Sequence, residues 1–253
     1  MAGAFFFQQR DAVAAGMTRE LGCDSVAFEG DALTICTRPE SAAWPFIAML
    51  CTFGTGTALS IDPNYREWAE ANLPARHYRS LTPDFLFPLV AEGQRRGIVL
   101  EAQAANLCFA LGQRPVPPTD VPGFAFERED PAWMTAQRAS GIFHNALGRP
   151  DEAYRSNQDR FAILAYDIAG DLAAVAGVFN TTGLFEIGVD VARGYRGHGL
   201  ANAVVARATA AILEVHETPY YSCGATNIRS QRTALANGYL PVCSIGYVAP
   251  KTP

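Results

Sequence analysis

The chain has 253 residues, of which 49% are apolar and 18% charged, and its formal net charge is -5. This apolar content is sufficient for packed cores and excludes a largely disordered chain. A net negative charge argues against nucleic-acid binding, which usually shows a basic excess. The length accommodates one large domain or two small ones.

The N-terminus and the cysteines give no sign of export or of a metal site. The first ten residues, MAGAFFFQQR, lack the basic start and the long apolar run of a signal peptide. None of the six cysteines forms a CxxC pair or lies at metal-ligand spacing from a histidine. We therefore expect a cytoplasmic protein with reduced, mostly buried thiols and no bound metal. Lys251 is the only lysine among 20 basic residues, which is typical of a bacterial gene rich in G and C.

The first half contains three interpretable segments. SVAFEGDALTIC (25–36) predicts a hairpin around Gly30 and Asp31. FIAMLCTFGTGTALSID (46–62) predicts buried strands with a glycine interruption. The stretch from Ala42 to Ile61 carries no charge but is broken by proline and glycine, so it does not predict a membrane span, and we expect no membrane partner. DPNYREWAEANL (62–73) predicts a helix with Asp62 as N-cap and proline at its first position.

A proline-rich segment follows. LGQRPVPPTDVPGF (111–124) has four prolines within eight positions, which remove backbone donors and disfavour a helix. We read it as a semi-extended linker. It divides the chain into a divergent N-terminal α/β domain (1–113), the linker itself (114–123) and a C-terminal domain (124–253).

The second half alternates strands and helices. A strand at 124–129 precedes a helix that opens with Asp130 as N-cap and Pro131. Apolar runs on both sides of residues 169–171 predict a hairpin. The remaining elements are a strand (183–191), a helix from Leu200 with one apolar face, a strand (219–225), a helix closed by glycine (227–238) and a final strand pair (239–249). The fold class is therefore α/β, with a mixed sheet.

The stretch VDVARGYRGHGLANA (189–203) joins a strand, a basic turn with three glycines and a helix start. Glycines at 197 and 199 let the backbone turn sharply and approach a ligand. The helix that follows directs free N–H groups and the positive end of its dipole at the turn, which suits a phosphate. The stretch lacks the lysine of a Walker loop, and its glycine spacing and preceding hairpin fit a dinucleotide fingerprint poorly.

A third pattern does fit. Arg196-Gly197-His198-Gly199-Leu200-Ala201 matches R/Q-x-x-G-x-G/A and resembles the acetyl-coenzyme A loop of the GNAT superfamily of N-acetyltransferases. EIGVDVARGYRGHGLA (186–201) and NIRSQRTALANGY (227–239) are similar to later strand–helix pairs of that family, and the element order is also similar. The closest likeness is to two-part bacterial members of the zwittermicin-resistance type. The resemblance implies a C-terminal GNAT acyltransferase fold preceded by a divergent, degenerate GNAT-like domain.

The resemblance also implies roles for individual residues. Backbone groups of Val189 and Val191 would pair with the pantetheine arm as an added strand. Glu186 lies at the strand position that often carries the general base, and Asn227 would lie near the thioester. The remaining implied cofactor contacts are Arg196, Gly197, His198, Gly199, Leu200, Ala201 and Ser230. The tyrosine that many relatives use as the general acid falls at Ala234.

Several of these residues have a structural alternative. Glu186 suits a solvated strand position or an ion pair, and Asn227 suits a helix N-cap. His198 is expected to line the turn by its backbone, and Asp190 to be a surface charge. For the missing acid, the candidates are Tyr220, Tyr221, His198, Cys223 and Ser230, although Cys223 is better explained as a structural thiol.

Together these features predict an acetyl-CoA-dependent N-acetyltransferase that uses a carboxylate base and no metal. The acidic residues outnumber the basic residues by 13 to 9 before Val121 and by 12 to 11 from there on, which favours a small cationic amine as acceptor. The alternatives are a protein or peptide N-acetyltransferase and a non-catalytic CoA-binding sensor. The sequence does not indicate an oligomeric state.

Overall fold

The computed structural model describes residues 2–40, 42, 46–73, 83–113, 115–152 and 156–251. The chain forms two compact units, and neither is one continuous segment. Unit 1 comprises Met1–Val13, Phe109–Ser222 and Asn227–Leu240, and unit 2 comprises Ala14–Cys108, Cys223–Thr226 and Pro241–Pro253. Within the described residues, no helix combines the length and apolar character needed to cross a membrane. The predicted domain boundaries at 113 and 124 stay a prediction.

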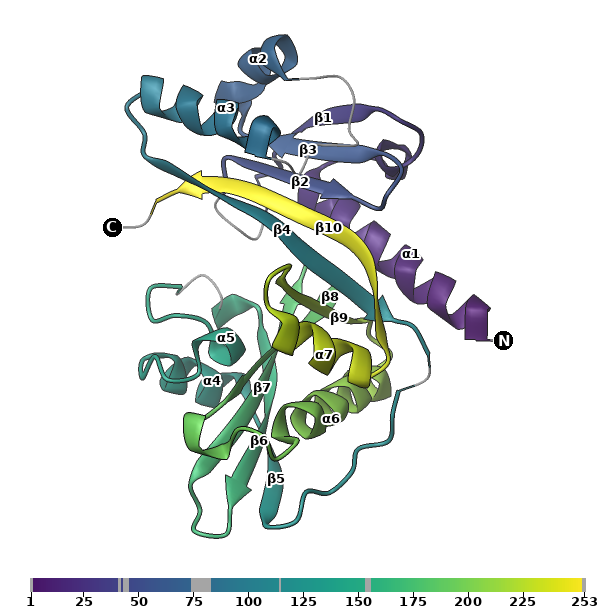
Figure 1. Cartoon of the computed structure of the whole chain (residues 1–253), viewed down its shortest axis with the longest axis vertical. Coiled ribbons are helices and arrows are strands. Elements are labelled where there is room, and N and C mark those ends of the chain that lie inside the picture. Colours follow the sequence, from purple (N-terminus) through teal and green to yellow (C-terminus); the bar gives the residue numbers. More distant parts are fainter. Residues whose placement is uncertain are drawn as a thin grey trace. The chain divides into compact units, whose positions relative to one another are not determined.

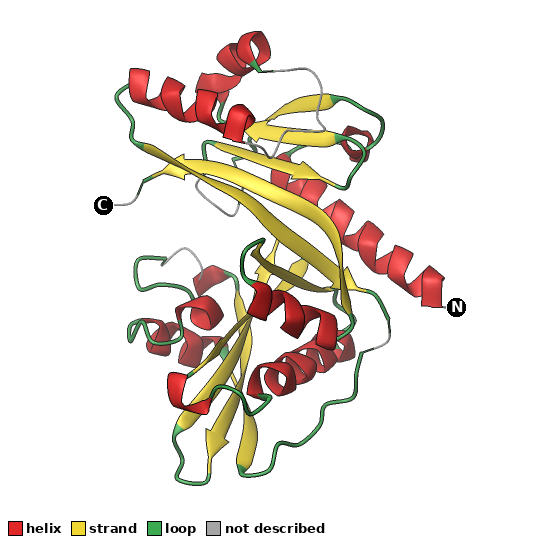
Figure 2. Ribbon diagram, in the orientation of Figure 1, coloured by secondary structure: helices red, strands yellow, loops and turns green. Residues whose placement is uncertain are grey.

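The sheet of unit 1 contains five strands in the order β9-β8-β7-β6-β5 (Figures 1 and 2). Strands β5 (Phe124–Glu129), β6 (Asp159–Asp167), β7 (Leu172–Thr181) and β8 (Leu184–Val191) form an antiparallel series. Strand β9 (Pro219–Gly224) pairs with β8 in parallel. The sheet is thus mixed.

Consecutive residues along β6 and β7 are buried, which shows that both faces of these strands are covered. Met134 of α4 (Pro131–Arg138) and Ala146 of α5 (His144–Leu147) pack with Leu164 and Val175 on one face. The apolar helix α6 (Leu200–Glu214) contacts β6, β7 and β8. Since alternate residues of a strand point to opposite faces, α6 covers the face that α4 and α5 leave open. A short 3-10 turn (Arg193–Tyr195) precedes α6. Helix α7 (Ile228–Ala236) contacts α6.

The strands of unit 2 follow the order β1-β3-β2-β10-β4. Its strands are β1 (Leu33–Thr37), β2 (Ala48–Thr52), β3 (Thr57–Ile61), β4 (Leu100–Leu111) and β10 (Tyr239–Pro250), of which β4 and β10 contribute their ends to unit 1. The 3-10 helix η1 (Ser25–Phe28) precedes β1, and α2 (Pro63–Asn72) and α3 (Pro83–Arg95) follow β3. Leu50, Leu59, Leu86 and Leu89 belong to its buried core. Helix α1 (Ala2–Leu21) contributes residues to both units.

Most second-half elements predicted from the sequence are confirmed. The strand at 124–129, the Asp130 N-cap, which accepts a hydrogen bond from Trp133 N, and the hairpin around 169–171 are all present. The final strand pair is wrong, because 239–250 form the single strand β10. The proline-rich segment forms no helix or strand over 115–123, and residue 114 lies outside the described residues. Arg207 of α6 holds this segment through the Asp120 carboxylate, at 2.7 Å, and the Thr119 carbonyl, at 2.9 Å.

The first half is confirmed in part. The glycine-interrupted strands are β2 and β3, which pair antiparallel, and α2 begins after the Asp62 N-cap as predicted. The hairpin predicted at 25–36 is wrong. Residues 25–28 form η1, whose Phe28 carbonyl accepts from Gly56 N at 3.0 Å, and β1 pairs in parallel with β3. Residues 25–36 therefore pair with Gly56 and β3, which lie further along the chain, and not with each other in a hairpin.

Candidate functional site

The strand β8 loses its neighbour β9 partway along its length. Their parallel pairing covers two residue pairs, Phe185 with Pro219 and Glu186 with Tyr220. Phe185 N donates to Thr218 O, and Ala192 N donates to Ala173 O. Because the β7–β8 register has no shift, the odd-numbered residues of β8 direct their backbone groups toward the β9 side. The backbone groups of Val189 and Val191 therefore face a side on which the described β9 residues no longer pair with the strand.

The glycine turn (194–199) follows β8 immediately. Two of its three glycines have a backbone conformation that favours glycine. Gly197 has φ +88° and Gly199, the N-cap of α6, has φ +80°, a region that favours glycine. Gly194 has no positive φ, so its backbone would accept another residue. A Cβ built at either 197 or 199 meets nothing within 4 Å, so the turn faces open space.

No side chain caps the N-terminus of α6. The Leu200 side chain is buried, at 1% exposure, so only its backbone can face a ligand. The first N–H groups of a helix have no intrahelical acceptor, and the dipole adds partial positive charge. The turn therefore suits an anionic group such as a phosphate.

The side chains of the turn are engaged locally. Arg196 is exposed, and its Nε lies 3.4 Å from the Val191 carbonyl oxygen on the side that β9 leaves open. The exposed His198 ring lies with Nδ1 3.1 Å from the Tyr195 carbonyl oxygen, so this nitrogen carries the proton. The Tyr195 hydroxyl donates to Asp167 at 2.7 Å. This bond lowers the pKa of Asp167 and raises that of Tyr195 to about 12, and it ties the turn to the β6–β7 hairpin.

Glu186 lies at the point where β8 and β9 separate. Ser222 Oγ of β9 donates to Glu186 Oε1 at 2.5 Å. The Glu186 residue is half-buried. From the sequence we expected Glu186 to be a general base, a solvated carboxylate or a member of an ion pair. The structure adds a contact that none of these includes, because a neutral hydroxyl orients the carboxylate.

The second predicted segment, 227–239, contains a helix N-cap and a serine hydroxyl that contacts a tyrosine hydroxyl. Asn227 is exposed and caps α7, with its Oδ1 accepting from Ser230 N at 3.2 Å. Ser230 Oγ lies 2.8 Å from the hydroxyl of Tyr221, a residue that is 1% exposed. Ala234 is completely buried, so the core occupies the position where relatives carry a tyrosine. Within the described residues, no cluster of three or more His, Cys, Asp or Glu is arranged to hold a metal.

Asp190 is not the surface charge that we expected. Its carboxylate accepts from Asn145 N and Nδ2, both at 2.7 Å, and from Ala146 N at 3.1 Å, which anchors the start of α5 to β8. Gly177 and Gly188 face each other across β7 and β8. A Cβ at either one would lie within 2.1 Å of a backbone oxygen of residues 145–146. These two glycines therefore allow the α5 backbone to lie directly on the sheet.

Comparison with solved structures places the mixed sheet of this chain in the GNAT fold. A GCN5-related N-acetyltransferase-like protein from Streptococcus suis matches with a TM-score of 0.50 and 15% identity, over 97% of this chain and 100% of that one. A GCN5-related N-acetyltransferase from Sphaerobacter thermophilus gives a TM-score of 0.50 and 15% identity, over 78% and 73% of the two chains. A Drosophila protein gives 0.53 and 14%, over 77% and 71%.

These likenesses show the fold, a mixed α/β arrangement. No protein-family model and no curated protein sequence matches the chain. The zwittermicin-resistance type stays a prediction.

Proposed function

We propose that this protein is an acetyl-CoA-dependent N-acetyltransferase acting on the primary amine of a small cationic molecule. The observation that carries the proposal is the separation of β8 from β9 after Glu186. It leaves the backbone of Val189 and Val191 without β9 partners on the side that leads into the glycine turn. A linear amide-containing arm beside a phosphate site is the ligand chemistry that this arrangement suits.

The binding residues act mainly through the backbone. Val189 and Val191 offer strand hydrogen bonds to the amides of the pantetheine arm, and the N–H groups from Gly197 to Ala201 hold the pyrophosphate. The exposed Arg196 side chain adds a positive charge beside them. Asn227 keeps its side-chain N–H groups for the ligand, because its Oδ1 is used by the α7 cap. Acetyl-CoA supplies an activated acetyl group as a thioester.

Glu186 acts as the general base. An ammonium group must lose a proton before its nitrogen can attack a carbonyl carbon, and a carboxylate accepts this proton directly or through water. The Ser222 hydroxyl fixes the orientation of the Glu186 carboxylate. This positions the base at the point where the two strands separate.

The Tyr221–Ser230 pair returns a proton to the departing thiolate. Their hydroxyl oxygens are 2.8 Å apart, so a proton given up by Ser230 can be replaced from Tyr221. This pair takes the place of the tyrosine that the sequence lacks at Ala234. Tyr221→Phe should lower kcat while leaving coenzyme A affinity unchanged, and Ser230→Ala should also lower kcat.

The experiment is calorimetric titration with acetyl-CoA and with coenzyme A, followed by an amine screen. We expect micromolar binding by the wild type and none by the Arg196→Ala, Gly199→Glu protein. The matched control is Arg193→Ala, Gly194→Ala in the same turn, since Gly194 needs no positive φ. Absence of wild-type binding would refute the cofactor assignment.

The amine screen separates the remaining possibilities. Turnover of cationic amines, lost in Glu186→Gln, would support the proposal. Equal turnover of anionic amines would remove the basis for a cationic acceptor, and turnover of peptides alone would establish the peptide N-acetyltransferase. Tight binding without turnover of any amine would indicate a CoA sensor, which the buried Ala234 would then explain.

A further inference from the structure

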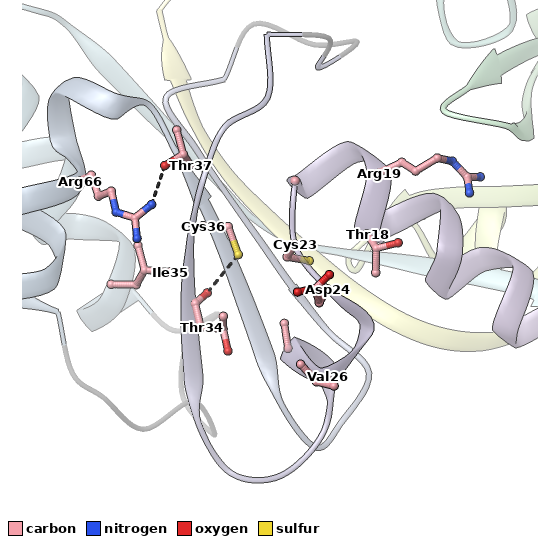
Figure 3. A pocket seen from close by; sticks show the side chains of 12 residues that line it. Thr18, Arg19, Cys23, Asp24, Val26, Thr34, Ile35, Cys36, Thr37 and Arg66 are labelled. Atoms are coloured by element: carbon pink, nitrogen blue, oxygen red, sulfur yellow. Dashed lines mark hydrogen bonds between the residues drawn. The ribbon is translucent and has the colours of Figure 1, made fainter.

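A pocket of about 610 Å³ lies in unit 2, far along the sequence from the glycine turn. The end of α1 and the residues after it form one wall, and β1 forms another (Figure 3). Cys23 and Cys36 line the pocket, one from each wall. The proposed acetyl-transfer site uses none of the residues that line it.

Backbone packing brings these two walls together. Gly22 has φ +66°, and a Cβ built there would lie 3.0 Å from the Thr37 carbonyl oxygen. Cys23 N donates to Thr18 O at 3.1 Å as α1 ends. The end of the helix is therefore pressed against β1, with Cys23 and Cys36 each one residue from this contact. Figure 3 shows both sulfur atoms in the space between α1 and β1.

The two thiols interact, and their surroundings make them unequal. The side-chain hydrogen bond between them raises the pKa of Cys23 and lowers that of Cys36. Arg66 lowers the Cys36 pKa further, while burial and Asp24 oppose this. Arg66 is held in place by the Thr37 hydroxyl at 2.5 Å and the Glu70 carboxylate at 2.8 Å. Cys36 Sγ donates to the Thr34 carbonyl at 3.9 Å in the reduced pair (Figure 3). Because the pKa of Cys36 is lowered and that of Cys23 is raised, Cys36 is the thiol that ionises first and acts as the nucleophile.

Three other cysteines of unit 2 provide a contrast. Cys51, Cys108 and Cys243 lie on adjacent strands and are between 0% and 6% exposed. Burial raises the pKa of Cys51 and Cys243. None of the three lines the pocket. Cys23 is half-buried and Cys36 is 8% exposed, and both line the pocket.

We propose that Cys23 and Cys36 form a redox-active dithiol that exchanges with low-molecular-weight disulfides and closes an intramolecular disulfide bond. The Cys36 thiolate attacks one sulfur of the small disulfide, forms a mixed disulfide and releases one thiolate, which takes a proton from solvent. Cys36 then no longer carries the charge that holds the proton on Cys23. Cys23 loses that proton to solvent, attacks the Cys36 sulfur and expels the second thiolate. Two protein thiols are oxidised, and one small disulfide is reduced to two thiols.

The test uses the full chain with a Cys223→Ser substitution, because Cys223 is the remaining half-buried thiol. The reduced, folded protein is incubated with oxidised glutathione, alkylated and analysed by intact mass. We expect the loss of two hydrogen atoms and no retained glutathione. Cleavage after glutamate separates the cysteines onto peptides 21–29 and 30–40, neither of which contains Cys51. These two peptides should be recovered cross-linked.

Two variants check the order of the steps. Cys23→Ser should retain one glutathione on Cys36, and Cys36→Ser should give no cross-link. The unsubstituted protein should give the same cross-linked peptides as the Cys223→Ser parent. Retention of glutathione on Cys36 in the parent, a cross-link that involves Cys51, Cys108 or Cys243 in its place, or an unchanged mass would each overturn the proposal.

Discussion

The buried ion pair between Arg138 and Asp159 provides a quantitative test of the unit 1 fold. Arg138 Nη2 lies 2.7 Å from both carboxylate oxygens of Asp159, and the two side chains are 5% and 0% exposed. Arg138 Nε also donates to Leu147 O at 2.6 Å, so one guanidinium connects α4, the end of α5 and β6. Removing one partner leaves the other charge buried and unpaired, which costs about 3–5 kcal/mol.

We therefore expect Arg138→Met and Asp159→Leu each to lower the free energy of unfolding by about 3–5 kcal/mol. At roughly 2–4 °C per kcal/mol for a chain of this size, each variant should lose on the order of 10 °C in Tm. The double variant removes both charges and should lose less than either single one. Urea unfolding of all four proteins measures these values. A loss under about 1 kcal/mol in the singles, or a double loss equal to their sum, would refute the reasoning.

Three further predictions concern the turn and the sheet. Gly199→Ala should weaken coenzyme A binding about 5- to 30-fold, because an alanine at left-handed φ costs about 1–2 kcal/mol; calorimetry should find Gly194→Ala unaffected, and equal losses would contradict the proposed role of the turn. Gly188→Ala should lower the free energy of unfolding by about 1–3 kcal/mol in urea, since its Cβ would lie 2.1 Å from a backbone oxygen beside α5; an unchanged value would argue against that packing. Tyr195→Phe should raise the pKa of Asp167 in an NMR titration. Because the pKa of Asp167 is lowered in the folded state, the bond stabilises the protein above the unfolded pKa, and this advantage in urea midpoint should disappear as pH falls through the folded pKa.

The parts of the fold that could be predicted carry local signals. Asp130 followed by proline marks the start of α4, and residues 169–171 mark a hairpin, because the residues that decide these structures are neighbours. Helix α1 was not predicted, since its three consecutive phenylalanines do not follow the spacing of an amphipathic helix. The region 25–37 was misread because β1 pairs with β3 rather than with the residues beside it.

The candidate site divides in the same way. The glycine turn is visible in the sequence because its conformation is fixed by its own residues. The partners of Glu186 and Asp190 are 36 and 45 positions away, so neither Ser222 nor Asn145 could be assigned from spacing. The pair of Cys23 and Cys36 was equally hidden, because nothing at a spacing of 13 residues indicates that two thiols meet.

The place of β10 in unit 2 has a consequence for synthesis of the protein. Strand β10 lies between β2 and β4, although the other strands of unit 2 precede the whole of β5 to β9 in the chain. On the ribosome, β2 and β4 must therefore wait with open edges until β10 emerges, a delay on the order of ten seconds at about 5–20 residues per second. Open edges pair readily with other chains. The nascent protein is thus most exposed to misassociation, and most dependent on chaperones, during the interval in which most of unit 1 is being made.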